Sequence, residues 1–106
     1  MKITNINDYE IRFDNGKRIT FDHVQDCCER NYAQFEYLKE ELDGAIFDME
    51  FQEPLVFEHL KYGFNFGNHG KMFFIPCYSA QNGYYSRGVD IYFDDELVLD
   101  CEGELI

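Results

Sequence analysis

The sequence predicts an α+β domain, in which an antiparallel sheet of about six or seven strands carries one main α-helix on one face. Short segments of alternating apolar and polar residues, separated by turn residues, favour antiparallel hairpins. One segment, about residues 27–42, shows helical spacing instead. Such a helix needs an apolar surface to cover, and one face of an antiparallel sheet provides it.

The composition indicates one folded domain over residues 1–106. Apolar residues make up 45% of the chain and aromatic residues 18%, with eleven phenylalanines and eight tyrosines. This is too much apolar area for a disordered chain, despite a net charge of −12. No internal repeat, low-complexity segment or linker divides the sequence. We therefore expect a single core composed largely of phenylalanine.

Residues 9–21 (YEIRFDNGKRITF) predict the first hairpin. A three-residue loop, Asp14-Asn15-Gly16, keeps the apolar side chains of both strands on one face, whereas a two-residue turn would separate them. Gly16 then supplies the left-handed position of a bulged turn. The predicted pairs are Phe13 with Lys17, Ile11 with Ile19, and Tyr9 with Phe21.

The helix is predicted for about residues 27–42. Asp26 and Glu29 have the spacing of a capping box at its start, and Gly44 follows its end, where a glycine often terminates a helix. The apolar residues that recur at helical spacing are Cys28, Tyr32, Phe35, Leu38 and Leu42.

Beyond Gly44 the apolar pattern returns to a period of two. Residues 45–51 are expected to form a strand, and residues 55–60 a strand or a short turn of helix. A second hairpin is predicted around residues 67–70, and the polar segment 79–88 is expected to be a loop. A last hairpin turns at Asp94-Asp95-Glu96 and sets Val89, Ile91 and Phe93 against Leu97, Leu99 and Cys101.

Charge and hydropathy indicate in which compartment the protein acts and which kinds of partner it binds. Residues 89–106 contain seven acids and no Lys or Arg, which argues against direct binding of nucleic acid because phosphates need clustered cations. No stretch approaches the roughly 20 apolar residues of a membrane helix, and the N-terminal residues lack the apolar region of a signal peptide. We therefore expect a cytoplasmic protein, in which the four cysteines stay reduced.

His23, Cys27 and Cys28 form a candidate thiol or metal site. The start of a helix lowers the pKa of a nearby thiol, and His23 offers a base, but neighbouring acids oppose thiolate formation. Cys28 falls on the apolar side of the predicted helix, and buried cysteines often only fill space. No second Cys/His pair at zinc-site spacing follows, so we predict neither a metal nor a cofactor.

The run His23-Val24-Gln25-Asp26-Cys27-Cys28-Glu29, with a tyrosine shortly after it at Tyr32, resembles small uncharacterised domains of gut bacteria and their phages. Those domains carry a similar His-x-Gln-Asp-Cys-Cys-Glu motif. The resemblance implies an origin in a bacterium or a mobile element, and it implies no activity.

Tyr78, Tyr84, Tyr85 and Arg87 form the candidate partner contact, in and beside the polar loop. Tyrosine combines apolar area with a hydroxyl group, and tyrosine and arginine commonly anchor protein interfaces. The alternative is that Tyr84 and Tyr85 begin a strand and that one of them packs inward.

The sequence thus favours a non-enzymatic binding domain, possessing an acidic and tyrosine-rich surface for a protein partner, as an inhibitor, an immunity-type module or a mobile-element protein would. Common catalytic motifs are absent from it. One alternative is a thiol- or metal-dependent site at His23, Cys27 and Cys28. Another is a structural domain that forms homo-oligomers through an exposed strand edge in residues 1–6 or 97–106.

Overall fold

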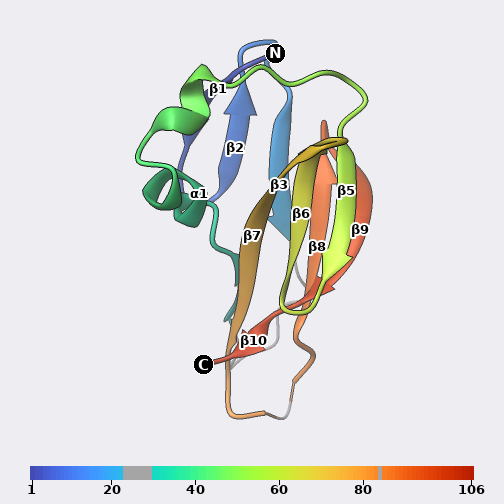
Figure 1. The fold of residues 1–106 in the computed structure, drawn as a ribbon. Helices are drawn as coiled ribbons and strands as arrows, with labels where there is room; N and C mark the ends of the chain where they lie inside the picture. Colours follow the sequence, from blue (N-terminus) through green and yellow to red (C-terminus); the bar gives the residue numbers. More distant parts are fainter. Residues whose placement is uncertain (23–29, 84) are drawn as a thin grey trace.

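The fold is mostly β, so the predicted α+β class is wrong. The computed structural model describes residues 1–22, 30–83 and 85–106, and within these ranges it contains ten strands in two sheets. One short α-helix and one 3-10 turn complete the described elements. Figure 1 shows the helix beside the strands near the N-terminus, where it covers little of either sheet.

The first sheet has the strand order β1-β2-β3-β8-β9, and all its neighbours are antiparallel. The first hairpin has the predicted three-residue loop, because the Phe13 N–H donates to the Lys17 carbonyl at 2.9 Å. Tyr9 does not join the apolar face as predicted; it precedes β2 and is 76% exposed. The strands are β1 (Ile3–Ile6), β2 (Glu10–Phe13), β3 (Arg18–Asp22), β8 (Gly88–Phe93) and β9 (Glu96–Glu102).

The hairpin of β8 and β9 has a tighter turn than predicted. Only Asp94 and Asp95 separate the paired residues Phe93 and Glu96, and both aspartates have positive φ, as a two-residue hairpin turn requires. Further along, Ile91 faces Leu99 as predicted. The register shifts between these two regions, which leaves Val98 as the extra residue of a β-bulge.

The second sheet is built around the long strand β7 (Lys71–Ala80). β6 and β4 run antiparallel to β7, and the short β10 runs parallel to it. The hairpin predicted around residues 67–70 is confirmed, and residues 55–60 contain a strand rather than a helical turn. The other strands are β4 (Arg30–Ala33), β5 (Val56–Leu60), β6 (Gly63–Asn68) and β10 (Glu104–Leu105).

The predicted helix over residues 27–42 is wrong for most of its described part. Residues 30–33 form β4, in which Asn31 and Ala33 are buried while the alternate residues are not. These residues adopt the strand rather than the helix conformation because their backbone pairs with β7 and their alternate side chains reach the core. Only α1 (Glu36–Glu41) is helical, and residues 27–29 lie outside the described residues.

The strand predicted for residues 45–51 is also wrong. Ala45–Asp48 form the 3-10 turn η1, which follows Gly44 at φ +80°. The left-handed glycine lets the chain turn directly from α1 into η1. Beyond η1, the Phe51 N–H donates to the Met1 carbonyl at 2.7 Å, so this segment lies along the start of the chain instead of entering a sheet.

The core lies between the two sheets. Phe51 links them, since its ring contacts Phe13 of the first sheet at 5.7 Å and Phe66 of the second at 5.8 Å. Isoleucine contributes to this core as much as phenylalanine does, through Ile11, Ile19 and others. Burial of these side chains is the main stabilising contribution to the fold. Among the described residues, no helix is long and apolar enough to cross a bilayer.

Candidate partner-contact surface

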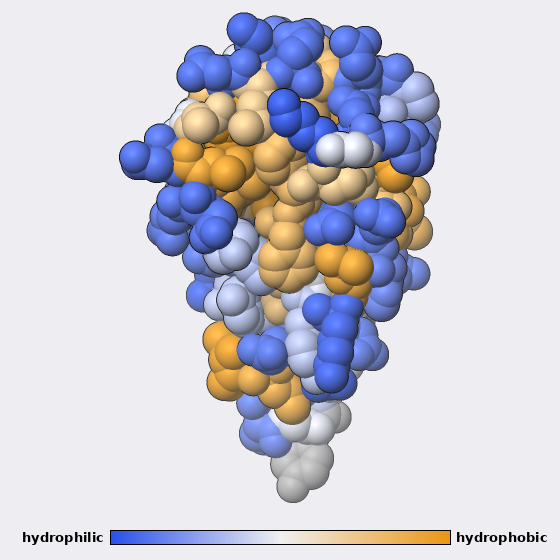
Figure 2. Space-filling view, in the orientation of Figure 1, coloured by the Kyte–Doolittle hydropathy of each residue, from blue (hydrophilic) through white to orange (hydrophobic). Residues whose placement is uncertain are grey.

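The outer face of the second sheet gathers tyrosines and cations. Strand alternation turns Ile75 and Cys77 of β7 inward and leaves Phe74, Pro76 and Tyr78 on the other face. Figure 2 shows apolar residues over the middle of the molecule, where β7 runs in Figure 1, with hydrophilic residues around them. The tyrosines and cations of this outer face are called the tyrosine surface, which is defined by Arg30, Tyr32, Lys61, Tyr62, Tyr78 and Arg87.

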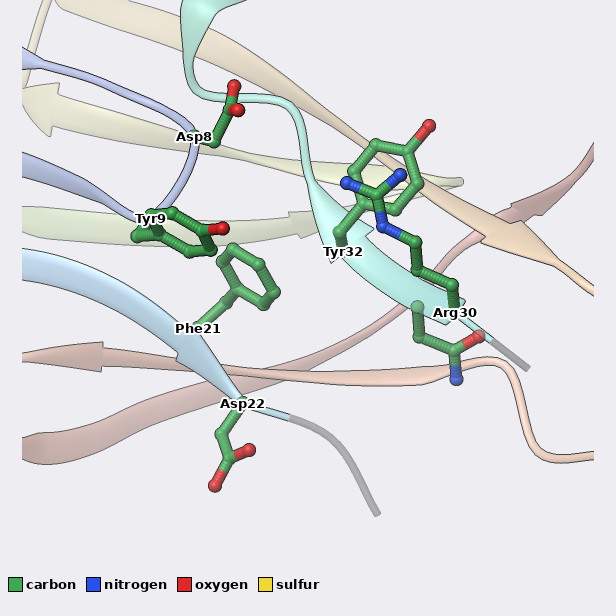
Figure 3. A pocket seen from close by; sticks show the side chains of 7 residues that line it. Asp8, Tyr9, Phe21, Asp22, Arg30 and Tyr32 are labelled. Carbon is green, nitrogen blue, oxygen red and sulfur yellow. The ribbon is translucent and has the colours of Figure 1, made fainter. Parts of the chain in front are cut away.

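Tyr32 and Tyr78 form the centre of the tyrosine surface. They stand directly opposite each other on β4 and β7, and their ring centroids are 5.8 Å apart. Both side chains are only partly buried. The guanidinium carbon of Arg30 lies 4.6 Å from the Tyr32 ring centroid, and Figure 3 shows it over that ring. This arrangement combines two aromatic faces with a stacked cation.

Tyr62 extends the surface on the other side of β7. It sits in the turn between β5 and β6 at φ +61°, and its carbonyl accepts a hydrogen bond from the Cys77 N–H at 2.9 Å. Lys61 Nζ lies 5.3 Å from the Tyr62 ring centroid, and the guanidinium carbon of Arg87 lies 5.9 Å from it. Tyr62 and Tyr78 together line a hollow of about 210 Å³, whose apolar part includes Phe74 and Pro76.

A second hollow, of about 390 Å³, lies beside Tyr32. Tyr9 and Phe21 lie side by side at one end of it, as Figure 3 shows, and the Arg30 guanidinium stands at the other. Asp8 and Asp22 add two acids to the lining, so this hollow is less cationic than the tyrosine surface itself. Tyr32 therefore lines the hollow of about 390 Å³, and Tyr78 lines the hollow of about 210 Å³.

A buried polar network fixes the loop that carries Arg87. Asn31 is 1% exposed, and its Nδ2 donates to the carbonyls of Ser86 at 2.8 Å and Gly88 at 3.2 Å. Its Oδ1 accepts a hydrogen bond from the Ser79 hydroxyl. Gln81 supports the same loop, because its Oε1 accepts from the Tyr85 N–H at 2.7 Å. These bonds tie the loop to β4 and β7, and they preorganise it.

The sequence-predicted contact residues are only partly brought together. Tyr78 and Arg87 both lie on the tyrosine surface, next to Tyr62. Tyr85 sits in the fixed loop, and Tyr84 lies outside the described residues. Sequence reasoning missed Tyr32 as a surface residue, because the helical interpretation placed it on a buried face. The alternation of Arg30 and Tyr32 around Asn31 was the signal that favoured a strand.

The candidate thiol or metal site at His23, Cys27 and Cys28 lies outside the described residues. The other two cysteines are buried in the core, Cys77 at 0% exposure and Cys101 at 2%. A hydrogen bond with Cys101, together with burial, raises the pKa of the Cys77 thiol far above its usual range. In residues 1–22, 30–83 and 85–106, no three His, Cys, Asp or Glu side chains are grouped so that they could hold a metal ion.

Three aspartates of the first sheet form an acidic cluster across neighbouring strands. Asp22, Asp90 and Asp100 stand directly opposite one another on the neighbouring strands β3, β8 and β9. The hydrogen bond with Asp100, burial and the two negative neighbours raise the pKa of Asp90 to about 6. This cluster of three aspartates is acidic, whereas the tyrosine surface carries three cations.

Comparison with known proteins identifies the family. A family model described as a domain of unknown function (DUF7448) matches residues 1–91, so the chain belongs to that family. The matched range runs from β1 into β8 and ends before β9. No curated protein and no solved structure shows significant similarity to the chain.

Proposed function

We propose that this member of the DUF7448 family is a non-enzymatic protein-binding domain that contacts its partner through the tyrosine surface. The observation that carries the proposal is the pair of half-buried rings of Tyr32 and Tyr78, with the Arg30 guanidinium stacked on one of them. Tyrosine and arginine dominate the binding energy of many interfaces because they bury large areas and retain polar groups.

The rigidity of this surface supports the proposal. Tyr32 and Tyr78 stand on paired strands, and the Asn31 network holds the Arg87 loop against the same sheet. Side chains that are already ordered lose little conformational entropy when a partner binds. A partner would therefore gain most of the contact energy that these residues offer.

Two of the three cations of the tyrosine surface, Arg30 and Lys61, are also available to a partner, whereas Arg87 forms an ion pair with Glu102 at 3.5 Å. Within the described part of the chain, no carboxylate forms an ion pair with Arg30 or Lys61, and each cation lies over a tyrosine ring. Stacking orders a cation while its N–H groups can still donate to acceptors on a partner.

Within this proposal the domain acts in the cytoplasm of a bacterium or of a phage-infected cell, as an inhibitor or immunity-type module. Its net charge of −12 and the resemblance at residues 23–29 support this role. A compact acidic domain of this kind blocks a partner by covering its surface and needs no chemistry of its own.

A matched pair of double variants tests the proposal. The variant R30A/Y78A removes an arginine and a tyrosine from the tyrosine surface, and R12A/Y92A removes the same residue types from the outer face of the first sheet. Each immobilised protein is used to capture partners from a lysate of the organism that encodes it, after its thermal unfolding has been compared with that of the wild type.

The expected result is that wild type and R12A/Y92A recover the same protein, while R30A/Y78A recovers at least about tenfold less of it. Equal recovery by both double variants would show that the tyrosine surface is not the contact. Recovery of no protein by the wild type would count against a binding function.

A further inference from the structure

A second contact surface lies where the last strands of the two sheets come together. β9 ends the first sheet and β5 ends the second. The two strands contact each other, as Figure 1 shows, yet they do not pair with each other in either sheet. Each therefore directs backbone N–H and C=O groups to an open edge, which can accept a further strand.

The open edge of β9 is apolar where it bulges. Leu97 is 55% exposed and Val98 is 37% exposed, and Val98 is the bulge residue. Val98 also lines a hollow of about 270 Å³ between the two edges, together with Phe57 of β5 and Phe93 of β8. This hollow offers an apolar side chain a floor of two phenylalanine rings.

The rim of this hollow is acidic. Lys17 is its cation, and it is already held by Glu53 at 2.7 Å. Asp94 and Glu96 also line the hollow, and neither forms an ion pair with any cation in the described ranges. Asp100 adds further negative charge along β9, while Glu102 at the end of the strand is paired with Arg87 at 3.5 Å. A strand that adds to this edge therefore gains most if it carries lysine or arginine.

The same charges disfavour a second copy of this chain on the edge. Antiparallel pairing of two β9 strands centred on Val98 would place Glu96 opposite Asp100, and pairing centred on Leu99 would place it opposite Glu102. Directly opposed like charges destabilise a strand pair. An exposed apolar edge that repels itself is suited to a different, basic partner.

We propose that the β9 edge, with the hollow between Phe57 and Phe93, binds an extended basic segment of another protein by strand addition. In this arrangement backbone hydrogen bonds to β9 supply the pairing. An aliphatic side chain of the segment enters the hollow, and its flanking lysines or arginines face Glu96 and Asp100. This contact is separate from the tyrosine surface.

The probe is a fluorescently labelled synthetic peptide of alternating lysine and valine, titrated into the full chain. Its control is the same peptide with glutamate in place of lysine. Anisotropy is measured at low and high salt for the wild type and for two double variants of equal charge change. E96K/D100K reverses charges on β9, and E40K/E41K reverses two exposed charges of α1.

We expect the basic peptide to bind the wild type and E40K/E41K alike, to bind E96K/D100K at least about tenfold more weakly, and to bind less tightly at high salt. The glutamate peptide should not bind. Equal losses in both double variants would overturn the proposal, since they would show a response to net charge alone. So would absence of binding to the wild type.

Hydrogen exchange of the wild type gives a measurement that depends on no variant. Saturation with the basic peptide should slow exchange of the backbone amides in Glu96–Glu102 more than in any other strand. Protection elsewhere, or protection of this strand by concentration of the protein alone, would overturn the proposal; the latter would show pairing between copies. R30A/Y78A should bind the peptide like the wild type, because the tyrosine surface is a separate contact.

Discussion

Cys77 and Cys101 share a hydrogen bond in the interior, one thiol from each sheet. Both side chains are almost fully buried, and their contact raises the pKa of the Cys77 thiol. A thiol reacts through its thiolate, so burial and a raised pKa both suppress its chemistry. These two cysteines act as core residues that join the sheets.

We therefore predict that Cys77 and Cys101 resist thiol reagents while the domain is folded. In a C27S/C28S background, labelling by a disulfide reagent at mildly alkaline pH should be at least about a hundredfold slower for the native protein than for the protein in denaturant. Mass spectrometry of the labelled peptides identifies the sites. Rapid labelling of either cysteine in the native protein would contradict the buried hydrogen-bonded pair.

Asp90 makes the stability of the domain depend on pH. Its folded-state pKa is about 6, above the ordinary value of 3.8, because it shares a hydrogen bond with Asp100 and faces two negative neighbours. A raised pKa means that the native state binds the proton more tightly than the unfolded state. The stabilisation from this group is complete below pH 3.8 and is lost as the pH rises through about 6.

The substitution D90N should remove that part of the pH dependence. At pH 7 we expect it to raise the free energy of unfolding by up to about 1 kcal/mol, a value reduced for screening by solvent. At pH 4 we expect almost no change. Urea unfolding at both pH values measures the difference, with D48N at an exposed acid of η1 as the control. An identical change at both pH values would contradict the prediction.

Asn31 should be the most sensitive polar residue in the described part of the chain. N31A would leave the Ser86 and Gly88 carbonyls without their amide donor and would remove the acceptor of the Ser79 hydroxyl. Unsatisfied buried groups cost about 1–3 kcal/mol each, so we expect a loss of at least about 2 kcal/mol in urea unfolding.

Two further measurements distinguish this role of Asn31. N5A, at an exposed asparagine of β1, should change the free energy of unfolding by less than about 0.5 kcal/mol. In N31A the amides of residues 85–88 should exchange faster than in the wild type, because the loop loses its attachment to β4. Unchanged exchange there would show that Gln81 alone holds the loop.

The alternation of apolar and polar residues and the turn residues between them were sufficient to predict the hairpins. Ile11 faces Ile19, and Val89 faces Cys101, because turn chemistry and a two-residue period act over short distances. The last turn was predicted one residue too long, since the bulge at Val98 allows the apolar face to be kept with a two-residue turn. Bulges leave little trace in sequence.

The helix prediction failed because the apolar residues around positions 30–38 fit both a helical and a strand pattern. Tyr32, Phe35 and Leu38 have helical spacing, but Asn31 and Ala33 alternate with Arg30 and Tyr32 as a strand requires. The pairing partner, β7, lies more than forty residues later, so local propensity could not decide between them. The same distant pairing creates the Tyr32–Tyr78 contact, and for that reason the sequence pointed to Tyr78 and Arg87 without Tyr32 or Tyr62.

The pairing of β3 with β8 constrains how the domain is made. Residues 19–22 meet strand partners in residues 90–93, so the first sheet cannot be completed until residues 90–93 have left the ribosome. Such high contact order slows folding, because a long loop must close before the contacts that stabilise it form. The N-terminal hairpin therefore keeps an open strand edge along β3, which is free to pair with other chains, until β8 is synthesised.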